Sequence, residues 1–299
     1  MLTIVRRLLL SASLFMLAQG SFSQVTQHQV DPSTTGAAIK TIHGPHYALI
    51  DPIVKQNGKL LLFIVGTNGK STDWINFAGY AATLGYHSIC IDYKNLVNTV
   101  TCVESKDSGC FDGFRQEIMF GTPVSEMVEV DSANSIINRT TKLLQYLSKT
   151  YPSEKWNQFL QGNKIVWQKV VAAGHSQGAG HVVFLGKNYL LNRIIILAGP
   201  QDFLANFNTP APWLKRKTTT PLSRYYACLH VNDEYNFTRQ LANCNAIMMN
   251  HTSDTLMVQP NAAVRKPAHI LVADNPTENA HGAFHNAAFQ KVWDYLLKF

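Results

Sequence analysis

The sequence of 299 residues has no apolar run that could cross a bilayer as a helix, because the N-terminal stretch Leu8 to Leu17 is about half of the roughly 20 residues required. It also has no proline- and serine-rich linker that would divide the chain. The formal net charge of +7 is spread along the chain, and the tight basic cluster at 215–217 is more typical of a solvated loop than of a polyanion site. The sequence therefore predicts neither a stable membrane span nor a nucleic-acid partner.

The first residues are ordered like a secretory signal. Arg6 and Arg7 precede the apolar stretch, and small residues follow from Ala18 to Ser23. We expect residues 1–24 to be cleaved, which leaves a single domain at 25–299 in a secreted or periplasmic protein. No cysteine lies near the cleavage region, which argues against a bacterial lipoprotein anchor.

Five cysteines accompany this exported pattern. Cys102 and Cys110 bracket a short polar segment, and an oxidising compartment lets such a pair persist as a disulfide, so we expect a bridge between them. Cys228 and Cys244 could form a second bridge. Cys90 lies within an apolar strand pattern and is expected to be a buried free thiol.

The pentapeptide Gly174-His175-Ser176-Gln177-Gly178 is the strongest chemical signal in the chain. It follows the apolar residues 170–173 and precedes the helix-compatible stretch 179–190. This context is typical of a nucleophile elbow, in which a serine on a strained strand-to-helix turn exposes its Oγ and flanking glycines allow the strand and helix to approach. We therefore predict Ser176 as a nucleophile.

Apolar runs alternate with helical patterns on both sides of the elbow. The predicted strands are 59–65, 87–93, 170–173, 193–198, 225–231 and 268–273. The predicted helices begin near Ser71 and Asp131, follow the elbow, and close the chain from Phe284 to Phe299. Such alternation predicts a parallel sheet with helices on both faces.

With the elbow in the place of the family's fifth strand, this order resembles the α/β-hydrolase family over roughly residues 42–299. The resemblance implies a mostly parallel central sheet and a triad in the chain order serine, acid, histidine. The acid position falls after 225–231, where Asp233 is the first choice and Glu234 the second. Asp202, after the strand at 193–198, stays open as an alternative.

The histidine is expected between the strand at 268–273 and the last helix. His281 is preferred because it lies in a loop-like stretch that can reach the elbow, whereas His285 is expected to begin the helix. The i, i+4 spacing of these two histidines is also compatible with a metal site, but no glutamate stands beside either in the pattern of a zinc protease. We predict no metal.

The oxyanion of an acyl-transfer reaction requires two preorganised N–H donors. One is expected from the backbone of Gln177, and the resemblance places the second in the loop Gly66-Thr67-Asn68-Gly69, at Thr67. The same loop continues into Lys70-Ser71 and is similar to the phosphate-binding loop of Mur-ligase-type ATP enzymes. Ile64 stands where the full motif requires glycine, so we predict no nucleotide and no cofactor.

These residues together predict an exported serine hydrolase that cleaves a carboxylic ester, esterase- or lipase-like, through an acyl-enzyme. Acyl transfer to another alcohol and peptide-bond cleavage use the same triad and stay open, as does a secreted binding module of the same fold without catalysis. The substrate would be a small ester or a lipid. The insertion at 93–130 is expected to cover part of the site, and the excursion at 199–224 occupies the place of the family's lid.

Overall fold

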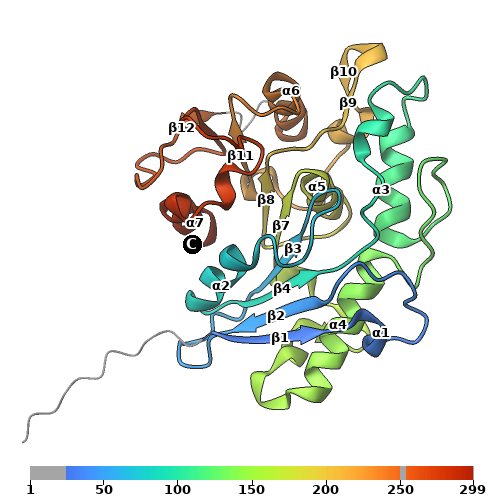
Figure 1. The fold of residues 1–299 in the computed structure, drawn as a ribbon, viewed down its shortest axis with the longest axis vertical. Coiled ribbons are helices and arrows are strands. Elements are labelled where there is room, and N and C mark those ends of the chain that lie inside the picture. Colours follow the sequence, from blue (N-terminus) through green and yellow to red (C-terminus); the bar gives the residue numbers. More distant parts are fainter. Residues whose placement is uncertain (1–24, 250–253, 299) are drawn as a thin grey trace, which may run out of the picture.

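The computed structural model describes residues 25–249 and 254–298, and its centre is a nine-stranded sheet (Figure 1). The strands follow the order β1-β2-β4-β3-β7-β8-β11-β13-β12. From β4 to β12 in this order all strands run parallel, whereas β2 runs antiparallel to β1 and to β4. These strands are β1 (Thr26–Val30), β2 (His46–Ile50), β3 (Leu60–Ile64), β4 (His87–Ile91), β7 (Val170–His175), β8 (Arg193–Leu197), β11 (Tyr225–His230), β12 (Thr255–Met257) and β13 (Ile270–Ala273).

Helices cover both faces of this sheet. They are α1 (Pro32–Thr35), α2 (Ile75–Thr83), α3 (Cys110–Phe120), α4 (Ile136–Thr150), α5 (Gln177–Asn188), α6 (Phe237–Met248) and α7 (Gln290–Leu297). α2 and α7 lie on one side, where the rings of Phe77 and Trp293 are 5.5 Å apart, and α3, α4 and α5 lie on the other (Figure 1). Two small hairpins stand outside the sheet: β5 (Leu160–Gln161) with β6 (Lys164–Ile165), and β9 (Phe203–Leu204) with β10 (Thr209–Pro210).

The central strands are buried on both faces, as their unbroken apolar sequences require. Every residue of β3 and of β4 is buried, and β7 is buried up to His175. The order of the strands, the antiparallel edge at β1 and β2, and the helices on both faces make this an α/β-hydrolase fold, which confirms the predicted fold class.

Three predicted helix starts differ from the structure. The helix expected from Asp131 begins at Ile136, after turns at 132–134 and with Ser135 as its N-cap. The chain forms turns after Ser71, so α2 begins only at Ile75. The closing helix begins at Gln290 instead of Phe284, because two 3-10 turns precede it and the Asn286 side chain accepts from the Ala288 N–H between them. The predicted signal segment 1–24 lies outside the described residues. In the described part of the chain, no helix is both long and apolar enough to span a bilayer.

The cysteines resolve into one bridge and three free thiols. Cys102 and Cys110 are bonded, which confirms the predicted disulfide, and Cys90 is a buried free thiol as predicted. The second bridge that was left open does not form, because Cys228 and Cys244 are both free and buried. The Sγ of Cys244 instead lies 3.4 Å from the carbonyl oxygen of Gly199, so it is directed towards the loop after β8.

The disulfide joins the 3-10 turn Thr99–Cys102 to the first residue of α3. We expect the double variant Cys102→Ser/Cys110→Ser to unfold with a free energy about 2 to 3 kcal/mol lower than wild type, because a bridge over about nine residues restricts the unfolded chain by that amount. Chemical denaturation measures this difference, with dithiothreitol-treated wild type as the matched control. Mass mapping without reductant that found both thiols free would contradict the bridge.

Candidate active site

The turn between β7 and α5 holds Ser176 in a backbone conformation that L-residues rarely adopt. Its φ and ψ are 55° and −118°, and its N–H donates to the carbonyl of Leu197 at 2.9 Å. The glycines on either side allow this close packing: a Cβ on Gly178 would lie 2.0 Å from the carbonyl oxygen of Ile64, and one on Gly174 would lie 2.2 Å from that of Gly178. The strained serine at the N-terminus of a helix has the geometry of a nucleophile elbow.

Asp233 and His281 meet across two loops at the same edge of the sheet. Asp233 follows β11, His281 follows β13, and His281 Nδ1 is 2.8 Å from Asp233 Oδ2. The other carboxylate oxygen accepts the Tyr235 N–H at 2.8 Å. Burial raises the pKa of Asp233, but its hydrogen bonds with His281, Gln240 and Tyr235 and the charge of His281 outweigh burial and hold the pKa below its usual value. Asp233 is therefore an ionised acceptor that orients the imidazole.

His281 also lies directly beside the elbow strand. Its ring centroid is 4.7 Å from that of His175, the residue before the serine, and His175 Nε2 is 3.0 Å from the His281 carbonyl oxygen. Desolvation lowers the pKa of His175 to about 3, so this ring is neutral and Nε2 is the donor to the carbonyl. On its other side the His281 ring contacts Tyr235, with centroids 4.4 Å apart. No specific signal in the sequence indicated this role of His175.

His285, Asp202 and Glu234, the alternatives to His281 and Asp233, lie in different environments. His285 is exposed, lies in the 3-10 turn Ala283–His285 and packs edge-on against Trp74 at 5.4 Å. Asp202 is fully buried and accepts hydrogen bonds from Arg115 and Trp213. Glu234 is exposed at the edge of a cavity. Only Asp233 among the three carboxylates is paired with His281 in the described chain.

The loop after β3 lies against the elbow. A Cβ on Gly66 would be 2.9 Å from the Cβ of Ser176, and Thr67 donates its hydroxyl to Gln177 Oε1 at 2.6 Å. Thr67 and Gln177 carry the two backbone N–H groups expected to bind an oxyanion. Within the described residues neither of these two N–H groups has a hydrogen-bond acceptor, so both are available to a substrate.

Asn95 gives this loop its shape. Its side-chain amide donates to the carbonyls of Gly66 and Gly69, each at 2.8 Å, and its own carbonyl accepts the Asn68 N–H at 3.1 Å. Asn95 is 2% exposed and follows β4, and no feature of its sequence context indicated this contact. The loop is thus fixed by a buried side chain from the neighbouring strand.

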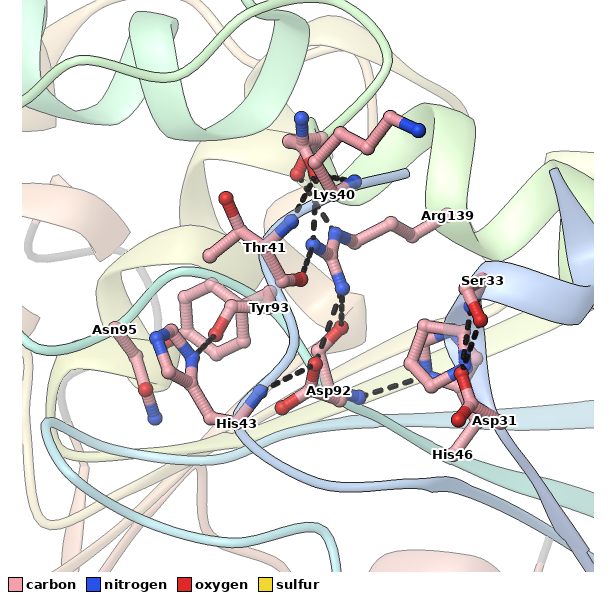
Figure 2. Close-up of polar contacts among 12 residues, drawn as sticks. Asp31, Ser33, Lys40, Thr41, His43, His46, Asp92, Tyr93, Asn95 and Arg139 are labelled. Carbon is pink, nitrogen blue, oxygen red and sulfur yellow. Dashed lines mark hydrogen bonds and ion pairs between the residues drawn. The ribbon is translucent and has the colours of Figure 1, made fainter. Parts of the chain in front are cut away.

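The end of β4 that carries Asn95 is itself held by a buried polar cluster (Figure 2). The Arg139 guanidinium donates to the carboxylate and carbonyl of Asp92 and to the carbonyls of Thr41 and Asn134. His43 adds a contact from its Nδ1 to the Tyr93 carbonyl at 3.0 Å. The loop after β3 is therefore linked through Asn95 to a segment that a buried ion pair and several hydrogen bonds hold in place.

The same loop has few free donors for a nucleotide. The N–H groups of Asn68, Gly69 and Lys70 already donate to Asn95 O, Gly66 O and Asp73 Oδ2. A phosphate-binding loop needs such groups to point at the phosphates. The Lys70 side chain is exposed and Ser71 is buried.

Lys70→Ala consequently tests the two interpretations of this loop. We expect ester turnover within about threefold of wild type, because a backbone donor does not depend on a side chain three residues away. ATP should leave the melting temperature of wild type unchanged, since a ligand raises it only by binding the folded state. A rise with ATP in wild type that disappears in Lys70→Ala would instead support a phosphate site.

A cavity of about 400 Å³ opens beside Tyr235. Its lining residues are Val100, Val103, Glu104, Gln201, Glu234, Tyr235, Asn236 and Arg239. They come from the segments after β4, β8 and β11, and Tyr235 also contacts the His281 ring. A larger cavity of about 600 Å³, lined by Arg193 and Lys298 among others, lies where β8 begins, at the opposite edge of the sheet. The described residues contain no group of three potential ligands that could hold a metal ion.

The sequence matches no protein-family model, and no curated protein sequence matches it. Among solved structures, the chain is similar to a Klebsiella pneumoniae protein provisionally described as a dienelactone hydrolase, with a TM-score of 0.48 and 9% identity. The match covers 92% of this chain and 100% of that one. At this identity it says nothing about a shared substrate.

Proposed function

We propose that this protein is an exported serine hydrolase that cleaves a carboxylic ester through an acyl-enzyme. The observation that carries the proposal is the 2.8 Å contact between His281 Nδ1 and Asp233 Oδ2, with the His281 ring 4.7 Å from that of His175, the residue before the strained Ser176. A serine hydroxyl is a weak nucleophile at neutral pH and needs an oriented imidazole to accept its proton. Here the carboxylate and the His175 ring hold His281 from two sides.

In the proposed reaction, His281 Nε2 takes the Ser176 proton as Oγ attacks the ester carbonyl. The carbonyl π electrons move onto oxygen, and the N–H groups of Gln177 and Thr67 stabilise the oxyanion. The tetrahedral intermediate collapses, the C–O bond to the alcohol breaks, and His281 donates its proton to the leaving oxygen. Water, deprotonated by His281, then attacks the acyl-enzyme by the same route and releases the acid.

The cavity beside Tyr235 supports a small substrate. A volume of about 400 Å³ lies within the usual range for small-molecule sites and is formed by both aliphatic and polar side chains. Export is proposed from the N-terminal pattern, and the Cys102–Cys110 bridge is compatible with an oxidising compartment.

A panel of p-nitrophenyl esters of increasing acyl length, together with a fluorophosphonate probe, tests the proposal. We expect the probe to label wild type at Ser176 and turnover to depend on acyl length. A binding module would be neither labelled nor active. Labelling without ester hydrolysis would favour a peptidase, and a faster reaction on adding a second alcohol, with a new ester as product, would favour acyl transfer.

A further inference from the structure

The proposed reaction does not use Arg115, a fully buried arginine that touches the elbow. It lies on α3, within the insertion at 93–130. Its Nε and Nη2 donate to the two carboxylate oxygens of Asp202 at 3.1 and 2.6 Å, and its Nη1 donates to the carbonyl of Gln177 at 2.6 Å. Trp213 also donates to Asp202, at 3.0 Å.

Burying this ion pair in the core carries a desolvation cost. Neither Arg115 nor Asp202 has any exposed side-chain surface, and removing both charges from water costs more than apolar side chains of similar volume would. The guanidinium also leaves room only for glycine at position 180 of α5, because a Cβ there would lie 2.1 Å from Arg115 Nη2. Stability alone does not account for a charged pair at this position.

The contact at Gln177 suggests what the pair does. In a helix the carbonyl of residue 177 accepts the amide of residue 181, and Arg115 occupies its other lone-pair direction. Gln177 carries one of the two N–H groups that would bind the oxyanion, and Thr67 holds its side chain. The guanidinium lies between Asp202 and Gln177, so the positive end of the ion pair faces the start of α5.

We propose that Arg115 is a positioning residue that fixes Gln177 so that its backbone N–H points at the developing oxyanion. This inference rests on the proposed hydrolase function. Arg115 belongs to the insertion at 93–130, and its partners Asp202 and Trp213 belong to the excursion at 199–224. The insertion at 93–130 and the excursion at 199–224 thereby both contribute to the ion pair that contacts the Gln177 carbonyl.

The test compares Arg115→Met, which removes the charge and the donors, with Arg115→Lys, which keeps the charge. Loss of an oxyanion donor lowers kcat about 10² to 10³-fold, and a misplaced donor should cost less. We expect Arg115→Met to lower kcat about 10- to 100-fold with KM within threefold of wild type. Arg115→Lys should recover part of that loss. Assays run well below the lowest melting temperature, with the fold checked by circular dichroism.

Lys187→Met is the matched control. Lys187 is a buried residue near the end of α5, the helix that Gln177 begins, and it donates to the carbonyls of Leu214 and Arg216 in the excursion at 199–224, with no hydrogen bond to Gln177 among the described residues. Lys187→Met should lower the melting temperature and leave kcat within threefold of wild type. An equal fall of kcat in this variant, or an unchanged kcat in Arg115→Met, would overturn the inference.

Two further outcomes are informative. If Arg115→Met does not fold, the test rests on Arg115→Lys. A lysine ammonium cannot donate to Asp202 and Gln177 in the forked geometry of the guanidinium. A kcat of Arg115→Lys equal to that of wild type would therefore reject the positioning role. If wild type is neither labelled by the fluorophosphonate nor active on any ester, the proposed function itself fails. An active wild type with an unaffected Arg115→Met leaves that function standing and removes only this inference.

Discussion

Ser176→Ala is expected to lower kcat/KM for p-nitrophenyl esters by about 10³-fold or more, because every covalent step of the proposed reaction passes through Oγ. The melting temperature should remain close to that of wild type, since a single oxygen at a turn contributes little packing. Initial rates and thermal melts on the same preparations measure the two quantities.

The control for this variant is Ser148→Ala on α4, whose hydroxyl donates to the Leu144 carbonyl within its own helix. Its activity should equal that of wild type. A Ser176→Ala protein that kept a tenth of the wild-type rate would show that the ester is cleaved elsewhere in the molecule.

His281→Ala should be as damaging as loss of the serine, about 10³-fold or more in kcat, because no other described side chain shares the carboxylate of Asp233 in the same way. His285→Ala should change kcat only a few fold, since that ring packs on Trp74 and is exposed. Steady-state rates of the two variants decide between the histidines, and the reverse ranking would move the base to His285.

Residues that act as one unit give non-additive losses. The double variant Ser176→Ala/His281→Ala should therefore be no slower than either single variant. If the losses multiplied, the two side chains would act in separate steps, and the proposed proton transfer between them would be rejected.

Most buried parallel strands could be predicted from sequence because each is a largely apolar run. Strands β1, β2 and β12 were missed: the edge strand Thr26–Val30 is polar and only partly buried, the edge strand Thr255–Met257 is short and largely exposed, and β2 is a short buried strand that pairs antiparallel to β1 and β4. Helices α3 and α6 were missed for a different reason. Their buried faces include polar residues, such as Arg115 and Glu117 on α3, which hide the apolar period that marks a helix.

For the candidate site, chain order was more informative than local composition. Asp233 and His281 could be named because an acid after one strand and a histidine after the next fit a family order, and the structure brings these two together. The supporting contacts of Asn95 and Arg115 depend on three-dimensional proximity between segments far apart in the chain. No spacing rule identifies such partners, since a lone asparagine or arginine has many other uses.

The glycines around the elbow limit which positions of this protein could be re-engineered. A side chain at Gly174, Gly178 or Gly180 would collide with backbone or with the Arg115 guanidinium, so a randomised library should return almost only glycine at these codons after selection for activity. On the cavity wall, Val100 and Glu104 are solvent-exposed and can vary more freely, whereas Tyr235 packs on the His281 ring. Mutagenesis to alter substrate preference should therefore keep the elbow residues and vary the exposed residues that line the cavity.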